Sequence, residues 1–165
     1  LVDVLPGDMF VHRNVANLVI HTDFNCFSVM QFAIDVLKVE HIIVCGHYRC
    51  GGVQAALQQQ SFGLVDNWLR HIQDIIVKHQ RYLDTFATEQ ERLDKLCELN
   101  VMEQVFNVCE NTLVRNAWQR GQKLSVHGWI YGVEDGLLRD LALSLSSTAE
   151  MKAAVHRLLT QTQAI

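Results

Sequence analysis

The sequence lacks the features that mark several specialised protein classes. It has no apolar run long enough to span a bilayer, and it has no internal repeat, low-complexity tract or interdomain linker. Its net charge of −4 and pI near 6.0 exclude the general attraction to nucleic acid or anionic membrane that a basic chain has. We therefore expect neither nucleic acid nor a membrane among its partners.

The cysteine count excludes an ordinary disulfide scaffold. Five cysteines are an odd number with no obvious framework, which favours a reducing compartment, and we expect a cytoplasmic protein. The chain opens Leu1-Val2-Asp3-Val4 with no visible targeting region, so this start says little about localisation. Hydrophobic content of 49% and charged content of 19% exclude disorder and predict one globular domain over residues 1–165.

Apolar periodicity predicts alternating strands and helices. We expect strands over 9–12, 41–45 and 124–131 and a short last strand over 141–145. Helices are predicted over 26–38, behind a start at Asp23 or Asn25, and over 90–119. Three more helices are predicted: one from residue 53, one capped by Asp66, and one after Ser147, which forms a capping box with Glu150. The fold class predicted is α/β, with a mainly parallel sheet flanked by helices and a short antiparallel edge strand.

The loop from His47 to Gly52 is the strongest candidate for a functional site. It follows the buried strand 41–45, and ligands of open α/β sheets bind beyond the carboxyl ends of strands. His47 and Cys50 offer an imidazole and a thiolate, the donors that zinc prefers. His-x-x-Cys alone is a weak signal, because about 0.24 chance copies are expected in this composition. The competing interpretation is a buried thiol and a surface histidine in an ordinary turn.

Two ligands do not complete a zinc site, and no other residue is a good candidate to join them. We expect Cys45 to point away from His47, His127 to be structural, and Asp3 not to bind metal. Cys26, Cys97 and Cys109 fall in helical patterns and are interpreted as core residues. The remaining histidines are interpreted as surface or interface residues: His12, His21, His71, His79 and His156.

Four segments together carry a specific resemblance to a known family. They are LPGDMFVHRNVAN at residues 5–17, HIIVCGHYRCGG at 41–52, CELNV at 97–101 and HGWIYG at 127–132. On these motifs the chain resembles the bacterial β-class carbonic anhydrases over nearly its whole length. The resemblance implies a β-carbonic anhydrase-like fold and self-association as a dimer or tetramer.

The resemblance also implies a cofactor and a reaction. The family binds zinc through Cys, His and Cys, and His47 and Cys50 match the later pair. The first ligand lies in a Cys-x-Asp-x-Arg segment that does not occur in the 165 residues, and neither does the family's N-terminal arm. We therefore expect one zinc per subunit, with its remaining ligands outside this sequence. The implied reaction is reversible hydration of CO₂ to bicarbonate and a proton by zinc-bound hydroxide. These residues alone are expected to be inactive.

Two further assignments concern anions. The backbone amides of Gly51 and Gly52, at a helix start, are hypothesised to face the developing bicarbonate. Arg13 and Tyr131 match the Arg and Tyr of a regulatory bicarbonate site found in part of the family, although Arg13 would also serve as a structural residue.

Two alternative functions remain open. One is a non-catalytic carbonic anhydrase-like domain with an incomplete metal site, acting as an interaction or scaffold module. The other is a phosphate- or nucleotide-binding α/β protein, which the absence of G-x-G-x-x-G and P-loop patterns disfavours.

Overall fold

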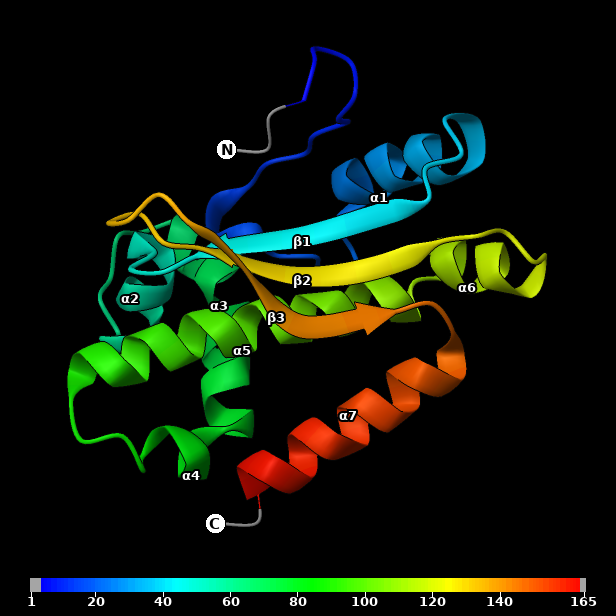
Figure 1. The fold of residues 1–165 in the computed structure, drawn as a ribbon. Helices are drawn as coiled ribbons and strands as arrows, with labels where there is room; N and C mark the ends of the chain where they lie inside the picture. Colours follow the sequence, from blue (N-terminus) through cyan, green and yellow to red (C-terminus); the bar gives the residue numbers. More distant parts are fainter. Residues whose placement is uncertain (1–3, 164–165) are drawn as a thin grey trace.

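The computed structural model describes residues 4–163 and contains a three-stranded sheet in the order β1-β2-β3. Strand β1 (His41–His47) pairs in parallel with β2 (Ser125–Tyr131), and β2 pairs antiparallel with β3 (Leu138–Leu145). Helices flank this mixed sheet (Figure 1). The predicted α/β class and the antiparallel edge strand are therefore confirmed, although β3 is as long as the other strands. Gly128 pairs with Leu143 and Trp129 with Asp140, which marks a bulge in β3.

Eight helices with α or 3-10 geometry and one π-helical turn are described between and around the strands. In chain order, the segments before β2 are η1 (Val15–Asn17), α1 (Phe24–Gln31), the π-helical η2 (Phe32–Val36), α2 (Gly51–Leu57), α3 (Val65–Lys78), α4 (Gln80–Leu83), α5 (Glu89–Glu110) and α6 (Thr112–Gln119). Helix α7 (Thr148–Gln163) follows β3. No helix within residues 4–163 is long and apolar enough to cross a membrane.

Helix α5 organises the core. It runs along the sheet and packs against β1, β2 and β3, while α7 packs against α5 and β3 (Figure 1). Thr88 and Glu91 form a reciprocal capping box that begins α5, since each side chain accepts a hydrogen bond from the other residue's backbone amide. Apolar side chains of α5 that face the sheet, such as Val101 and Val105, are fully buried. The predicted core cysteines Cys26, Cys97 and Cys109 are buried as expected.

The predicted strand over 9–12 is wrong for the part of the chain that the structure describes. A strand requires a hydrogen-bonded neighbour, and these residues make no backbone hydrogen bond within the described range. Residues 9–12 have the composition of a strand, but no segment of the described chain pairs with them.

Two helix boundaries also differ from the prediction. The helix expected over 90–119 is two helices, because Asn111 is extended (ψ 138°) and its side chain accepts a hydrogen bond from the Leu113 amide to begin α6. Asp66 lies inside α3, whose N-cap is Leu64, and accepts hydrogen bonds from the amides of Phe62 and Gly63. Asp23 caps α1 as expected.

Candidate functional site

The His47–Gly52 loop connects the end of β1 to the start of α2. His47 is the last residue of β1 and is the register partner of Tyr131 in β2. The amide of Tyr48 donates to the carbonyl of Tyr131 over 3.0 Å, so the β1–β2 ladder continues into the loop. The loop therefore lies at the carboxyl end of two adjacent parallel strands, as the sequence predicts.

The ring of His47 is exposed and held in one tautomer. Its Nδ1 lies 3.0 Å from the carbonyl oxygen of Tyr48. A carbonyl oxygen only accepts hydrogen bonds, so Nδ1 carries the proton and the neutral ring presents its Nε2 lone pair outward. Histidines that bind metals typically donate their second ring N–H to a carbonyl or carboxylate in this way.

Cys50 is the N-cap residue of α2, and only 5% of its surface is exposed. Cys97 of α5 lies beside this loop, and the backbone amides of Cys50 and Arg49 are near enough to its sulfur to act on its pKa. Burial raises the pKa of Cys97 to about 12, and these two amides only partly oppose the rise. Cys97 is therefore a neutral, structural thiol that lies beside the loop.

Arg49 and Tyr48 tie the opposite side of the loop to neighbouring elements. Arg49 has a φ of +57°, in the left-handed region that non-glycine residues seldom occupy, and its guanidinium pairs with Glu134 in the β2–β3 turn. The Tyr48 hydroxyl donates to Glu98 over 2.7 Å. Burial first, and then this carboxylate, raise the pKa of Tyr48, so its hydroxyl stays protonated.

A polar cavity of about 180 Å³ lies between the loop and the β2–β3 turn. Charged side chains of both signs line it, together with Tyr48, Gly132 and Val133: Arg49, Asp94, Glu134, Asp135 and Arg139. The Arg139 side chain donates to Asp135, and this hydrogen bond lowers the Asp135 pKa to about 2. The cavity is therefore a space with a charged lining that includes Tyr48 and Arg49 of the loop.

Two glycines let the backbones around the loop approach closely. A Cβ added at Gly46 would lie 2.6 Å from Val101 Cγ2 in α5 and 3.1 Å from Asn17 Oδ1. One added at Gly52 would lie 3.1 Å from Val15 Cγ1. The glycines on either side of the His-x-x-Cys pair therefore seat it against α5 and η1.

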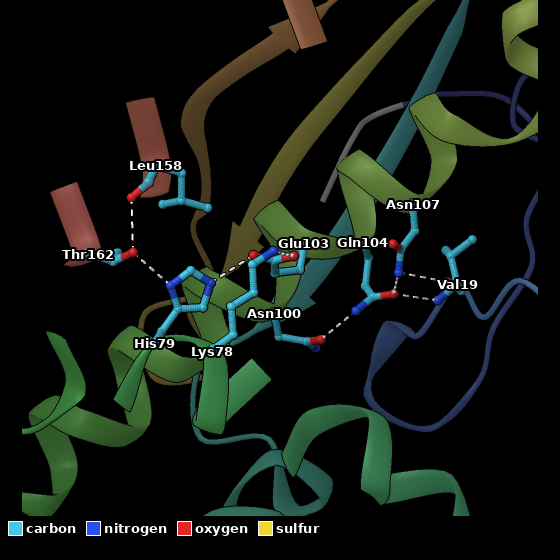
Figure 2. A network of polar contacts seen from close by, with 9 residues as sticks. All are labelled: Val19, Lys78, His79, Asn100, Glu103, Gln104, Asn107, Leu158 and Thr162. Atoms are coloured by element: carbon cyan, nitrogen blue, oxygen red, sulfur yellow. Dashed lines mark hydrogen bonds and ion pairs between the residues drawn. The ribbon is translucent and has the colours of Figure 1, made fainter. Parts of the chain in front are cut away.

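Helix α5 also holds the segment that follows Arg13. The Asn100 amide donates to the carbonyl of Ala16 over 2.9 Å, and the Gln104 side chain accepts from the amide of Val19 over 2.8 Å. Asn107 donates to the Val19 carbonyl over 3.0 Å (Figure 2). These polar residues recur every three or four positions, and this spacing is the sequence signal for a polar stripe along one side of α5.

A second polar cluster on α5 surrounds His79, and the prediction that this residue lies at the surface or an interface is wrong. His79 is fully buried; its Nε2 lies 2.7 Å from Glu103 and its Nδ1 2.9 Å from the Thr162 hydroxyl (Figure 2). Lys78 donates to the other oxygen of Glu103 over 2.8 Å. The signal was available, since His79 continues the apolar stripe of α3. The cluster joins α3, α5 and α7.

The predicted site residues are only partly brought together. Tyr131 is half-buried beside His47, whereas Arg13 is exposed and makes no hydrogen bond or ion pair within residues 4–163. The expectation that Cys45 points away from His47 is wrong. Val44 and Gly46 are buried while Cys45 and His47 are exposed, so the strand alternation puts both on one face of β1.

The two candidate zinc ligands suit the metal but do not complete its coordination. Nε2 of His47 and the Cys50 sulfur are the nitrogen and sulfur donors that zinc selects. In the described part of the chain they belong to no group of three or more potential ligands. His127, predicted to be structural, lies with its Nε2 3.0 Å from His41 Nδ1 and its Nδ1 2.8 Å from the Ser144 hydroxyl. Asp3 lies outside the described residues.

Comparisons with known proteins are consistent across sequence and structure. A family model described as carbonic anhydrase matches residues 1–138. The carbonic anhydrase of Emericella nidulans is 44% identical over 135 residues, which are 82% of this chain and 59% of that protein. That of Candida albicans is 38% identical over 84% of this chain and 50% of its own length. The chain thus spans between half and two thirds of the length of these two curated relatives.

Solved structures give the same result. The β-carbonic anhydrase of Coccomyxa, solved with acetazolamide, superimposes with a TM-score of 0.85 at 37% identity, covering 95% of this chain and 74% of that one. A structure from Sordaria macrospora, one of two described as tetrameric β-carbonic anhydrases, gives a TM-score of 0.79 at 37% identity, with coverage of 86% and 72%.

Proposed function

Because the chain belongs to the carbonic anhydrase family, we propose that its residues form part of a zinc-dependent carbonic anhydrase, a lyase that interconverts CO₂ and bicarbonate. The orientation of His47 carries this proposal. Its Nδ1–H donates to the Tyr48 carbonyl and its Nε2 is free, three residues before a cysteine at a helix start. A histidine held in this way is ready to bind a metal without rearrangement.

In this proposal Nε2 of His47 and Sγ of Cys50 hold the zinc, and the remaining ligands come from outside the 165 residues. When bound, zinc supplies an acidified water, with a pKa lowered to about 7. The protein's own contribution is positioning. The Tyr48 carbonyl fixes the imidazole, and Cys97 lies beside the amides of Arg49 and Cys50.

The first amides of α2 support a role in binding the anionic product. The N–H groups of Gly51 and Gly52 fall in the first turn of the helix, where amides have no carbonyl partner four residues earlier in the helix. A Cβ at Gly51 would meet no atom within 4 Å, so its amide is approachable. Gly51→Pro, which removes this donor, should reduce turnover more than zinc content. Unchanged turnover would contradict the role.

The test of the zinc site uses the natural full-length protein that contains these residues. His47→Ala and Cys50→Ser should each lower bound zinc by about tenfold or more and lower CO₂ hydration in parallel. The matched controls are His21→Ala, an exposed histidine, and Cys45→Ser, an exposed thiol on the same strand, and both should retain zinc and turnover. If wild type contained no zinc and did not hydrate CO₂, the scaffold alternative would replace the enzyme.

We further propose that Arg13 and Tyr131 bind a regulatory bicarbonate. The exposed guanidinium of Arg13 is free to form a bidentate contact with a planar anion, and Tyr131 lies beside the His47 loop. Arg13→Ala should weaken inhibition by bicarbonate while leaving basal turnover intact. Arg13→Lys tests the geometry, because lysine keeps the charge but loses the planar fork. Inhibition unchanged in both variants would rule out this site.

Self-association as a dimer or tetramer is proposed on two grounds. The relative from Sordaria macrospora is tetrameric, and this chain exposes large apolar side chains near its first helix. Phe10 and Phe32 are 51% and 47% exposed and contact each other, with ring centroids 5.8 Å apart. Phe32→Ser should shift the sedimentation coefficient toward that of the monomer, whereas Phe62→Ser, also exposed, should not. A monomeric wild type would contradict the proposal.

The expected cytoplasmic location is proposed on the cysteines. All five are free in the structure, which fits a reducing compartment. Fractionation of cells that express the full-length natural protein tests this location, and recovery in an organelle or secreted fraction would contradict it.

A further inference from the structure

A second group of metal-binding side chains lies outside the His47–Gly52 loop. His12, Asp23 and Cys26 each offer one ligand atom, and these three atoms lie within 4.8 Å of one another. His12 comes from the extended segment before η1, Asp23 is the N-cap of α1, and Cys26 lies in the first turn of that helix. Two separate segments therefore bring an imidazole, a carboxylate and a thiol to one place.

The hydrogen bonding of this group leaves a donor atom on each residue free. His12 Nε2 is buried and has no hydrogen-bond partner among the residues that the structure describes. Asp23 uses Oδ1 to accept from the amides of Asn25 and Cys26, at 3.1 and 3.2 Å, and the structure gives its Oδ2 no hydrogen bond within residues 4–163. Cys26 is only 4% exposed. A buried imidazole nitrogen without a partner needs an explanation, and a bound ion is one of the standard explanations.

We propose that His12, Asp23 and Cys26 form a second divalent-metal site, with zinc as the metal that best fits. An imidazole nitrogen, a carboxylate oxygen and a thiolate sulfur are all zinc ligands, whereas magnesium and calcium select oxygen donors alone. Three protein ligands leave a fourth position for water. Binding exchanges the Cys26 S–H bond for a metal–sulfur bond and releases the thiol proton to solvent.

The geometry requires only a small closure. Zinc–ligand distances of about 2.0–2.3 Å place tetrahedral donor atoms roughly 3.5 Å apart, so separations of at most 4.8 Å shrink by no more than about 1.3 Å. Burial and the Asp23 charge raise the Cys26 pKa to about 11, and a metal cation bound to the sulfur would favour the thiolate and so act in the opposite direction. The site would also fasten the extended segment of residues 9–12 to α1, in place of the strand pairing that this segment lacks.

The experiment keeps this site separate from the proposed zinc site of the enzyme. In the full chain carrying His47→Ala and Cys50→Ser, the loop cannot bind metal, so any remaining binding belongs elsewhere. Titration with Co²⁺ should then give a thiolate-to-cobalt charge-transfer band and tetrahedral d–d absorption that saturate at one equivalent. Further substitution of Cys26→Ala should abolish the charge-transfer band, and His12→Ala should weaken binding at least tenfold. Cys109→Ala, which removes another buried thiol, should change neither.

A second measurement covers variants that fold poorly. Asp23→Asn keeps an oxygen that can cap α1 but removes the charge, so it should fold while losing most of the Zn²⁺-induced rise in Tm seen in the parent. A parent chain without the cobalt–thiolate band, or a band that survives Cys26→Ala, would overturn the proposal. Because the loop ligands are absent throughout, neither result bears on the carbonic anhydrase assignment.

Discussion

Replacing Gly46 by alanine tests how closely β1 must lie on α5. The added methyl would sit 2.6 Å from Val101 Cγ2, whereas carbon atoms in contact are normally about 3.5–4.0 Å apart. Since Val101 is fully buried, strand and helix must separate by roughly 1 Å. Overpacking of this kind costs about 1–3 kcal/mol of unfolding free energy. His47 is the next residue, so zinc affinity in the full-length natural protein should fall as well.

A double-mutant cycle isolates the cause. Val101→Ala alone removes two buried carbons and should cost about 2–3 kcal/mol, but it also makes room for the new methyl. The double variant Gly46→Ala/Val101→Ala should therefore lose about 1–2 kcal/mol less unfolding free energy than the two single variants lose in total. Urea unfolding with an unchanged m-value measures this coupling.

Gly128→Ala provides the control for the cycle. Its added methyl would lie 3.3 Å from Val105 Cγ2, a contact that a small shift can relieve, so its cost should be smaller than that of Gly46→Ala. Additive effects of Gly46→Ala and Val101→Ala, within about 0.5 kcal/mol, would refute the argument that this contact excludes a side chain at position 46.

Three further substitutions test the polar cluster around His79, the His47–Gly52 loop, and the break between α5 and α6. Burial opposes ionisation of Glu103, but its histidine and lysine partners outweigh burial and hold the Glu103 pKa below its usual value. Ionised Glu103 therefore stabilises the fold above pH about 4.3, and this stabilisation is lost as the pH falls through the pKa of Glu103 in the folded protein. In Glu103→Gln the unfolding free energy should therefore fall less steeply between about pH 5 and 3 than in the wild type. The same fall in both proteins would contradict this. Arg49→Val should be about 1–2 kcal/mol less stable than Arg49→Gly in urea, because φ at this residue is +57°; equal stabilities would refute backbone strain as the cause. Asn111→Ala should cost about 1 kcal/mol by removing the cap of α6, and a loss below about 0.3 kcal/mol would show that the cap is unimportant.

Local sequence signals predicted much of the fold. The run Ile42-Ile43-Val44 predicted strand β1, although one face of this strand is exposed rather than buried, and the Gly51-Gly52 pair predicted the start of α2. The alternation after Leu124 predicted β2, and of the two residues expected to begin α1, Asp23 or Asn25, the structure selects Asp23. These features succeed because strand alternation, glycine-rich turns and helix caps depend on residues close to one another in the chain.

Other features depended on contacts that local patterns do not specify. Residues 9–12 have a strand-like composition, but strand formation needs a partner that the described chain does not supply. His79 continues the apolar stripe of α3, which indicated burial, but only the packing of α5 and α7 around it supplies its carboxylate and hydroxyl partners. The break at Asn111 was missed because its cap competes with a continuous apolar stripe.

The candidate site divides in the same way. The sequence by itself determined the donor types, since His47, Cys50 and the adjacent glycines stand within six residues of one another. Only the tertiary structure decided that Cys97 of α5 lies beside the loop and that Arg49 pairs with Glu134 in the β2–β3 turn. The physical reason is that ligand chemistry is a property of single side chains, whereas orientation and burial are set by segments that meet only when the chain folds.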